Sequence, residues 1–331
     1  MSPQPAFEHA LSLTAEADYH GLSTCLLQLI RPLPLVQAAE IYEVFNKDGD
    51  QVHQASDMEQ MVIRHFSRLL QSDRPVLDEY GLFIAISKGE TAELRSPDDY
   101  APGIRLIYPV PSDLGPMRLL VIDGDSGFAQ QRASLQQLVD LYRNLVRLHD
   151  SRERDLLTGL QNRQTFDNNM LKVMDHLRKI KQGTQPQQAW LAVLDIDHFK
   201  RINDNFGHLY GDEVLLRFAQ LIKKWFRSSD LAFRFGGEEF IVLMAKASET
   251  GAIAGLNRFR EAVAQHDFGK VGQVTVSIGF VRLECSTLPS TLIDQADQAL
   301  YQAKHAGRNR IVQYQPPETA AEADDDIELF D

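Results

Sequence analysis

The first 126 residues show a hydrophobic pattern that predicts a mixed α/β unit. Apolar residues recur at helical spacing over residues 5–17, 20–31 and 57–72, which indicates three helices. Apolar runs bounded by Gly, Pro and Asp predict strands at residues 38–45, 51–56, 81–87, 103–110 and 117–123. The first two of these strands flank Asp48-Gly49, a dipeptide typical of hairpin turns.

Residues 127–154 are expected to form one long, polar-rich helix. A 3-4-3 spacing along it links Leu135, Leu138, Tyr142 and Leu145. This apolar stripe either packs against the helix's own domain or forms the seam of a parallel dimer that joins two domains. A seam of fewer than three heptads is short, so the sequence leaves both interpretations open.

The segment from residue 155 to 314 has a clearer order of elements. Strands are expected over residues 190–196, 231–235, 240–244, 273–283 and 310–314. Helices are expected over residues 214–225, 250–265 and 290–306. The resulting β-α-β-β-α-β order predicts a ferredoxin-like antiparallel sheet with helices on one side, and an α+β fold class for the chain.

Composition indicates the class of protein and its cellular compartment. The chain has 331 residues, 44% apolar and 24% charged, which is typical of a soluble globular protein of about two domains. No apolar run approaches the roughly 18 residues of a membrane span. The first thirty residues hold acids but no Lys or Arg, unlike a secretory signal. Cys25 and Cys285 are too few for a disulfide framework or a four-ligand zinc site, so we expect a cytoplasmic protein.

The net charge of −12 is divided unevenly along the chain. Residues 1–150 carry a net charge of −9, whereas residues 151–314 carry 22 Lys and Arg against 18 Asp and Glu, a net charge of +4. Residues 315–331 hold seven acids and no base, and are expected to be a disordered, solvated tail. The overall charge opposes binding of a nucleic-acid polymer, and the basic segment favours a small anionic ligand.

Two acidic pairs stand at the ends of predicted strands. Asp195 and Asp197 close one strand, and Glu238 and Glu239 follow the glycine pair Gly236-Gly237 in a hairpin. In a ferredoxin-like sheet these strands are neighbours, so the pairs converge. Oxygen ligands of this kind suit Mg²⁺ bound together with substrate phosphates, and the two glycines let a phosphate approach the backbone. Either pair alone would be an ordinary polar strand end.

Polar residues that would recognise a nucleotide flank these clusters. Asn203 and Asp212 have the acceptor and donor groups that a guanine edge requires, although Asp212 alone would also suit the first turn of a helix. Lys304 and Arg308 lie four residues apart on one helix face, where they would bind a triphosphate together with Lys200 or simply complement the helix dipole.

Five segments together carry a family resemblance. They are DLLTGLQNR (155–163), DIDHFKRIND (195–204), FGHLYGD (206–212), RFGGEEF (234–240) and YQAKHAGRNR (301–310). In this order and spacing they resemble the motifs of GGDEF diguanylate cyclases, in a variant with Glu238 at the third signature position. The resemblance implies a palm-type nucleotidyl cyclase domain at residues 155–314. It also implies that the first motif fixes a turn.

The resemblance implies a reaction and assigns roles. Two GTP molecules would condense to cyclic di-GMP with release of two pyrophosphates, across a homodimer whose domains face each other. Two Mg²⁺ ions per site, or Mn²⁺ in their place, would be bound by Asp195, the carbonyl of Ile196 and Glu238. The catalytic acids would be Glu238 and Glu239. The substrate would contact Lys200, Asn203, His208, Asp212, Gly236, Gly237, Lys304 and Arg308.

Two further features follow from the resemblance. Arg227 and Asp230, with Arg258, would form an inhibitory site for the cyclic di-GMP product; otherwise Arg227 and Asp230 are an ordinary surface pair. Residues 1–126 resemble a GAF sensory and dimerisation domain, joined to the cyclase by residues 127–154. The alternatives are an inactive receptor for GTP or cyclic di-GMP, and a cyclase that uses ATP, which Asp212 disfavours because its carboxylate would face an acceptor of adenine.

Overall fold

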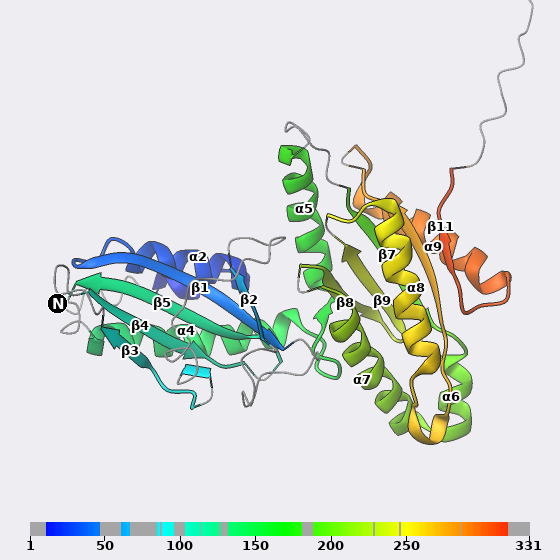
Figure 1. Cartoon of the computed structure of the whole chain (residues 1–331), viewed down its shortest axis with the longest axis horizontal. Helices are drawn as coiled ribbons and strands as arrows, with labels where there is room; N and C mark the ends of the chain where they lie inside the picture. The colour runs from blue at the N-terminus through cyan, green and yellow to red at the C-terminus, as the bar shows by residue number, and fades with distance from the viewer. Residues whose placement is uncertain are drawn as a thin grey trace, which may run out of the picture.

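Two β-sheets, each with its own helices, make up the described part of the chain (Figure 1). The computed structural model describes residues 11–46, 61–66, 85–86, 88–95, 103–112, 114–125, 127, 132–180, 188–227, 229–244, 246–284 and 286–316. The helix α4 (Arg132–Glu153) runs along the first sheet and ends at the second domain. No helix among these described residues is long and apolar enough to cross a membrane.

The first sheet has five antiparallel strands in the order β2-β1-β5-β4-β3. The strands are β1 (Val36–Asn46), β2 (Met61–His65), β3 (Ala92–Arg95), β4 (Gly103–Val110) and β5 (Met117–Asp125). The helices α2 (Tyr19–Ile30) and α4 share an apolar core with alternate residues of β1, β4 and β5. The opposite residues of these strands belong to a second, smaller core.

Two expectations for this domain are wrong. Residues 61–65 lie in the predicted helix 57–72 but form a strand, because pairing with β1 decides the conformation of a short apolar run that either element can accommodate. Ala85 and Ile86 lie in a predicted strand but are helical and buried. Residues 11–14 are helical as predicted, and the predicted strand 51–56 lies outside the described residues.

The apolar stripe of α4 packs within its own domain. Leu135 and Tyr142 are buried in the first core, and Leu138 and Leu145 are partly buried against it. The Tyr142 hydroxyl also shares a 2.7 Å hydrogen bond with the buried hydroxyl of Ser23 on α2. A dimer seam through this stripe is therefore wrong, because these side chains already have apolar partners in the same chain.

The second sheet has six strands in the order β11-β10-β7-β9-β8-β6. Its strands are β6 (Gln161–Asn162), β7 (Trp190–Ile196), β8 (Leu231–Gly236), β9 (Glu239–Met244), β10 (Val276–Arg282) and β11 (Ile311–Gln313). The central order β10-β7-β9-β8, with antiparallel neighbours, is the one predicted from the β-α-β-β-α-β pattern. The ferredoxin-like, α+β prediction for this domain is confirmed.

Helices cover both faces of this sheet, not one as predicted. One face packs against α6 (Phe199–Phe206), α7 (His208–Trp225) and α8 (Glu249–Gln265). The other packs against α5 (Arg163–Ile180) and α9 (Pro289–His305). We did not predict α5, whose buried face repeats at Phe166, Met170, Val173 and Met174. A short 3-10 turn at Gly269–Val271 precedes β10.

A buried ion pair between Arg118 and Asp150 anchors the end of α4 to the first sheet. The two terminal nitrogens of Arg118 on β5 donate to the two carboxylate oxygens of Asp150 at 2.7 and 2.8 Å, and the Ser112 hydroxyl donates to the same carboxylate. Arg154 contacts Asp150 at 3.4 Å and donates to the Gly159 carbonyl at 3.0 Å. One carboxylate thus contacts both the first sheet and the residue that opens the second domain.

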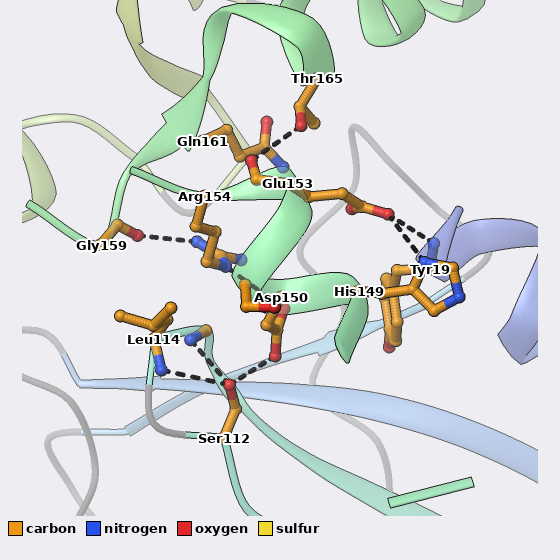
Figure 2. A network of polar contacts seen from close by, with 12 residues as sticks. Tyr19, Ser112, Leu114, His149, Asp150, Glu153, Arg154, Gly159, Gln161 and Thr165 are labelled. Atoms are coloured by element: carbon orange, nitrogen blue, oxygen red, sulfur yellow. Dashed lines mark hydrogen bonds and ion pairs between the residues drawn. The ribbon is translucent and has the colours of Figure 1, made fainter. Parts of the chain in front are cut away.

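Further contacts join the two domains beside this pair. The Glu153 carboxylate accepts a 2.7 Å hydrogen bond from the backbone N–H of Tyr19, and its carbonyl accepts one of 2.7 Å from the Thr165 hydroxyl (Figure 2). Lys172 on α5 lies 3.0 Å from Asp18, which caps the N-terminus of α2. The domain junction is therefore built from directional polar contacts.

Candidate active site

Three acids of the two predicted pairs, Asp195, Glu238 and Glu239, lie at the same end of the second sheet's central strands, whereas Asp197 does not join them. Asp195 on β7 stands directly opposite Glu239 on β9 in the antiparallel register. The backbone N–H of Ile196 donates to the Glu238 carbonyl at 3.4 Å, so the hairpin turn is attached to the end of β7. This arrangement places Asp195, Glu238 and Glu239 on adjacent backbone segments.

Lys304 on α9 contacts the acidic edge. Its ammonium lies 2.8 Å from a carboxylate oxygen of Asp195, whose residue is only 6% exposed. Burial raises the pKa of Asp195, and the Lys304 charge opposes that rise. The pKa of Glu238 is also raised, first by burial and then by the negative charge of Asp195. Mutual repulsion of this kind is relieved by a cation.

The donor set fits a hard divalent cation. It would consist of carboxylate oxygens from Asp195 and Glu238 and the backbone carbonyl of Ile196, the residue after Asp195, whose N–H contacts Glu238. Within the described ranges, no group of three or more His, Cys, Asp or Glu side chains is arranged to bind a metal by itself. Substrate phosphates and water would therefore have to complete the coordination, as is usual for Mg²⁺.

Arg234 on β8 holds the turn that carries Glu238. Two of its nitrogens donate to the Gly237 carbonyl at 3.1 and 2.9 Å, and a third donates to the Asp155 carboxylate at 3.0 Å. Gly237 has a φ of +43°, a left-handed conformation that suits glycine. Asp155 also accepts from the backbone N–H and the hydroxyl of Thr158, so the first motif fixes a turn, as expected.

The two expected base-binding residues lie on either side of the α6–α7 turn, Asn203 on α6 and Asp212 on α7. The Asn203 side chain lies so close to Gly211 that a Cβ on this glycine would stand 2.0 Å from Asn203 Oδ1. Asp212 follows Gly211 directly and is exposed, as is His208 at the start of α7. The Asn203 amide thus lies against the residue that precedes Asp212, and an amide with a carboxylate is the combination that a guanine edge would use.

The remaining expected substrate residues differ in their surroundings. Lys200 is exposed in the first turn of α6, and Arg308 is exposed in the loop that follows α9. Arg308 has a φ of +61° and donates its backbone N–H to the Ala303 carbonyl at 3.0 Å. Of the three expected phosphate-binding cations, Lys304 is the one with a carboxylate contact.

The expected inhibitory residues lie away from these acids, in the segment between α7 and β8 and on α8. The Asp230 carboxylate accepts a 3.0 Å hydrogen bond from the backbone N–H of Arg227, so it stabilises its own turn. The Arg227 and Arg258 side chains are exposed. This contact uses the backbone N–H of Arg227, whereas the surface pair expected from the i,i+3 spacing would use its side chain.

One acid of the predicted cluster has a different environment. Asp197 is 4% exposed and accepts hydrogen bonds from Thr275, Ser277 and the backbone N–H of Asn309. Alternation along an ideal strand would place it beside Asp195. The strand ends at Ile196, and His198 adopts a left-handed φ of +59°, so the alternation stops there.

The sheet order and the acids at the ends of β7 and β9 are those of a palm-type domain. Residues 152–310 match the model of the family described as "Diguanylate cyclase, GGDEF domain". The chain therefore contains a GGDEF domain, and the resemblance read from the five motifs is confirmed. The match begins at residue 152, and the GAF resemblance of residues 1–126 stays a prediction.

Curated relatives share this part of the chain. The diguanylate cyclase DgcP of Pseudomonas aeruginosa is 42% identical over 170 residues, which are 50% of this chain and 25% of DgcP. The diguanylate cyclase VdcA of Vibrio cholerae is 35% identical over 190 residues, 55% of this chain and 53% of VdcA. The chain thus spans about half or less of these relatives' length.

A solved structure agrees with the sequence comparisons. The coiled coil and GGDEF domain of DgcB from Caulobacter crescentus, determined in complex with c-di-GMP, superimposes with a TM-score of 0.50 at 29% identity. The likeness covers 57% of this chain and 100% of that one.

Proposed function

We propose that this protein is a diguanylate cyclase, which condenses two GTP molecules into cyclic di-GMP and releases two pyrophosphates. The observation that carries the proposal is the pairing of Asp195 opposite Glu239, with Glu238 attached to the same strand end and Lys304 against it. The names of the relatives add support, because both DgcP and VdcA are called diguanylate cyclases.

Divalent cations are part of this proposal. Asp195, the Ile196 carbonyl and Glu238 would hold two Mg²⁺ ions per site, and Mn²⁺ would serve in their place. When bound, such ions lower the pKa of a ribose hydroxyl and stabilise charge on the phosphates. The donor set of carboxylates and one carbonyl on adjacent strands is compatible with that role.

The chain's own residues would position the two nucleotides. Asn203 and Asp212 would hold the guanine, and Lys200, Lys304 and Arg308 would neutralise the triphosphate. Each 3′-hydroxyl attacks the α-phosphate of the other GTP. An O–P bond forms as the bond to pyrophosphate breaks, and Glu238 accepts the hydroxyl proton. Positioning of this kind supplies roughly 7–11 kcal/mol toward the barrier.

One domain holds one GTP, so the reaction needs two chains. We propose a homodimer in which residues 1–126 form the GAF-like sensory and dimerisation unit and residues 127–154 pass its state to the cyclase. The polar junction around Asp150 supports such coupling, since it connects β5 to the turn that opens the second domain. The acidic tail at 315–331 has no role in the proposal.

Product feedback is a further part of the proposal. Arg227 and Asp230 would bind cyclic di-GMP, with Arg258 completing the contact. Replacing Arg227 with alanine is expected to raise the final product level about fivefold without changing the initial rate, because one charge-assisted contact to a phosphate is lost. Progress curves at equal enzyme concentration measure both quantities. Superimposable curves for the two proteins would contradict the inhibitory role.

The direct test is to incubate purified protein with GTP and Mg²⁺ and to separate the products by chromatography. Cyclic di-GMP and two equivalents of pyrophosphate are expected. Binding of GTP without turnover would instead identify the inactive receptor. Product from ATP at a rate equal to that from GTP would identify the broader cyclase and remove the guanine role of Asp212.

Gly211 offers a separate test of the base site. Gly211→Ala is expected to raise KM for GTP about tenfold with little loss of stability, because the new Cβ must displace the mobile end of Asn203 and weaken its hydrogen bond to the base. Steady-state kinetics and thermal unfolding measure the two effects. In an Asn203→Ala background, Gly211→Ala should not raise KM for GTP any further. A further tenfold rise in KM there would mean that Gly211→Ala does not act through Asn203.

A further inference from the structure

The buried carboxylate of Asp197 joins the end of β7 to the loop after α9. One of its oxygens accepts from the Thr275 hydroxyl at 2.7 Å and from the Asn309 backbone N–H at 3.0 Å. The other accepts from the Ser277 hydroxyl at 2.7 Å. All three donors come from outside the acidic edge formed by β7 and β9, so this carboxylate faces away from the expected cation ligands.

The loop that Asp197 contacts has an uncommon backbone. Gly307, Arg308 and Asn309 have φ values of +111°, +61° and +45° in succession. Two adjacent side-chain-bearing residues in the left-handed region cost free energy, and such conformations persist only where surrounding contacts hold them. The Asn309 N–H bond to Asp197 is one such contact, and it lies directly after Arg308.

Other contacts hold the flanks of this loop. The Ile278 N–H donates to the Arg310 carbonyl at 2.9 Å, and Arg260 donates to the Asn309 side chain at 3.0 Å. These contacts fix the chain after the loop and the Asn309 side chain. The peptide between Arg308 and Asn309, which directly follows the Arg308 side chain, is held at its N–H by Asp197 at 3.0 Å and at its carbonyl by Arg310 Nε at 3.2 Å.

We propose that Asp197 is a positioning residue that holds the Arg308 loop in its left-handed conformation, so that the guanidinium faces the substrate phosphates. This inference rests on the proposed function for the role of Arg308. It also accounts for the two aspartates at the end of β7, Asp195 within the strand and Asp197 directly after it. Asp195 contacts Lys304 and Asp197 contacts Asn309, so the two ends of the basic segment 304–309 are each attached to the same strand end.

A carboxylate is well suited to this task. It accepts three hydrogen bonds at once and donates none, and bonds to a charged acceptor are stronger than bonds to a neutral one. An asparagine at this position has one acceptor oxygen, and its amide group repels the N–H of Asn309 unless the side chain turns. The nearby hydroxyls of Thr275 and Ser277 can rotate to adapt, whereas the backbone N–H cannot.

The test compares Asp197→Ala, Arg308→Ala and the double variant in steady-state assays with GTP. Asp197→Ala is expected to raise KM about tenfold with a smaller change in kcat, and the double variant to have the KM of Arg308→Ala alone. Ser277→Ala is the matched control, since it removes a bond to the other carboxylate oxygen. Its KM should stay at the wild-type value although its melting temperature falls.

Amide hydrogen exchange gives a readout that does not depend on activity. The Asn309 N–H should be protected in the wild-type protein and exchange at least tenfold faster in Asp197→Ala, with Ser277→Ala unchanged. If Asp197→Ala fails to fold, Asp197→Asn takes its place. We then expect the same rise in KM and the same faster exchange at Asn309, each smaller in size.

The outcomes separate the inference from the proposed function. Multiplicative KM effects in the double variant, or wild-type exchange at Asn309 in Asp197→Ala, would overturn the positioning role. A wild-type protein without cyclase activity would overturn the proposed function, and faster exchange in Asp197→Ala would then still support the attachment of the loop.

Discussion

Replacing Glu238 with glutamine is expected to lower the rate of cyclic di-GMP formation by at least about a hundredfold. Glu238 follows the turn held by Arg234, and its carbonyl accepts from Ile196 at the end of β7. Glutamine keeps the size of the side chain but provides one neutral acceptor, so it neither attracts a divalent cation nor takes the hydroxyl proton. Initial rates with GTP and Mg²⁺ measure the loss.

The signature itself supplies the matched control. Glu238→Asp restores the aspartate of the family signature and keeps the negative charge, so it should retain activity within about tenfold of the wild type. Neither variant should unfold at a lower temperature than the wild type, because Glu238 is only partly buried and its raised pKa means that its charge does not stabilise the folded protein. A glutamine variant that keeps more than a tenth of wild-type turnover would exclude the carboxylate from the reaction.

The acidic part of the candidate site was predictable because the order of strands in the sheet determines which strand ends are neighbours. Once the β-α-β-β pattern is read, the end of β7 and the turn before β9 must be neighbours, and Asp195 indeed stands opposite Glu239. The contact of Lys304 with Asp195, which we did not predict, has the same origin, since α9 follows β10 and packs on the sheet. Long-range neighbours follow from topology, and topology follows from the order of elements.

Local deviations from regular geometry were not predictable in this way. Asp197 faces the loop after α9 because β7 ends one residue earlier and His198 takes a left-handed conformation. The residues at that end of β7 do not by themselves distinguish it from a strand that is a few residues longer. The signal that we missed was the hydroxyl pair Thr275 and Ser277 on the neighbouring β10 segment, which suits a buried carboxylate.

Short apolar runs also limit how well secondary structure and packing can be predicted from the sequence. Met61-Val62-Ile63 fits a helix stripe as well as a strand, and pairing with β1 decides between them. The stripe on α4 was equally ambiguous, because apolar residues at 3-4-3 spacing pack against a sheet or against a second helix. The structure shows the first arrangement, with Tyr142 fully buried and hydrogen-bonded to Ser23.

Breaking the buried ion pair between Arg118 and Asp150 is expected to produce a large loss of stability. Both side chains are almost fully buried, at 2% and 4% exposure, and two hydrogen bonds of 2.7 and 2.8 Å join them. Asp150→Ala leaves the Arg118 charge buried without its carboxylate, which costs about 3–5 kcal/mol of unfolding free energy. Guanidinium titration followed by circular dichroism measures the change.

An exposed ion pair is the control for this substitution. Arg132 lies 3.2 Å from Glu93 and is 48% exposed, so Arg132→Ala should change the unfolding free energy by no more than about 1 kcal/mol. Replacing both buried partners, by Arg118→Met with Asp150→Leu, should cost less than the two single changes added together, since no charge is then left unpaired. Additive losses in the double variant would mean that the pair acts through packing alone.

The same pair determines how stability depends on pH. Burial alone would raise the pKa of Asp150, but the charges of Arg118 and then Arg154 and the Ser112 hydrogen bond hold it well below the ordinary value of 3.8. A lowered pKa in the folded state means that the contribution is complete above about pH 5 and is lost as the pH falls through 3.8 toward the folded value. The wild-type protein should therefore lose unfolding free energy more steeply than Asp150→Ala between about pH 4 and pH 2, so the two curves converge in acid. Parallel curves over that range would show that the carboxylate of Asp150 is not charged against Arg118 in the folded protein.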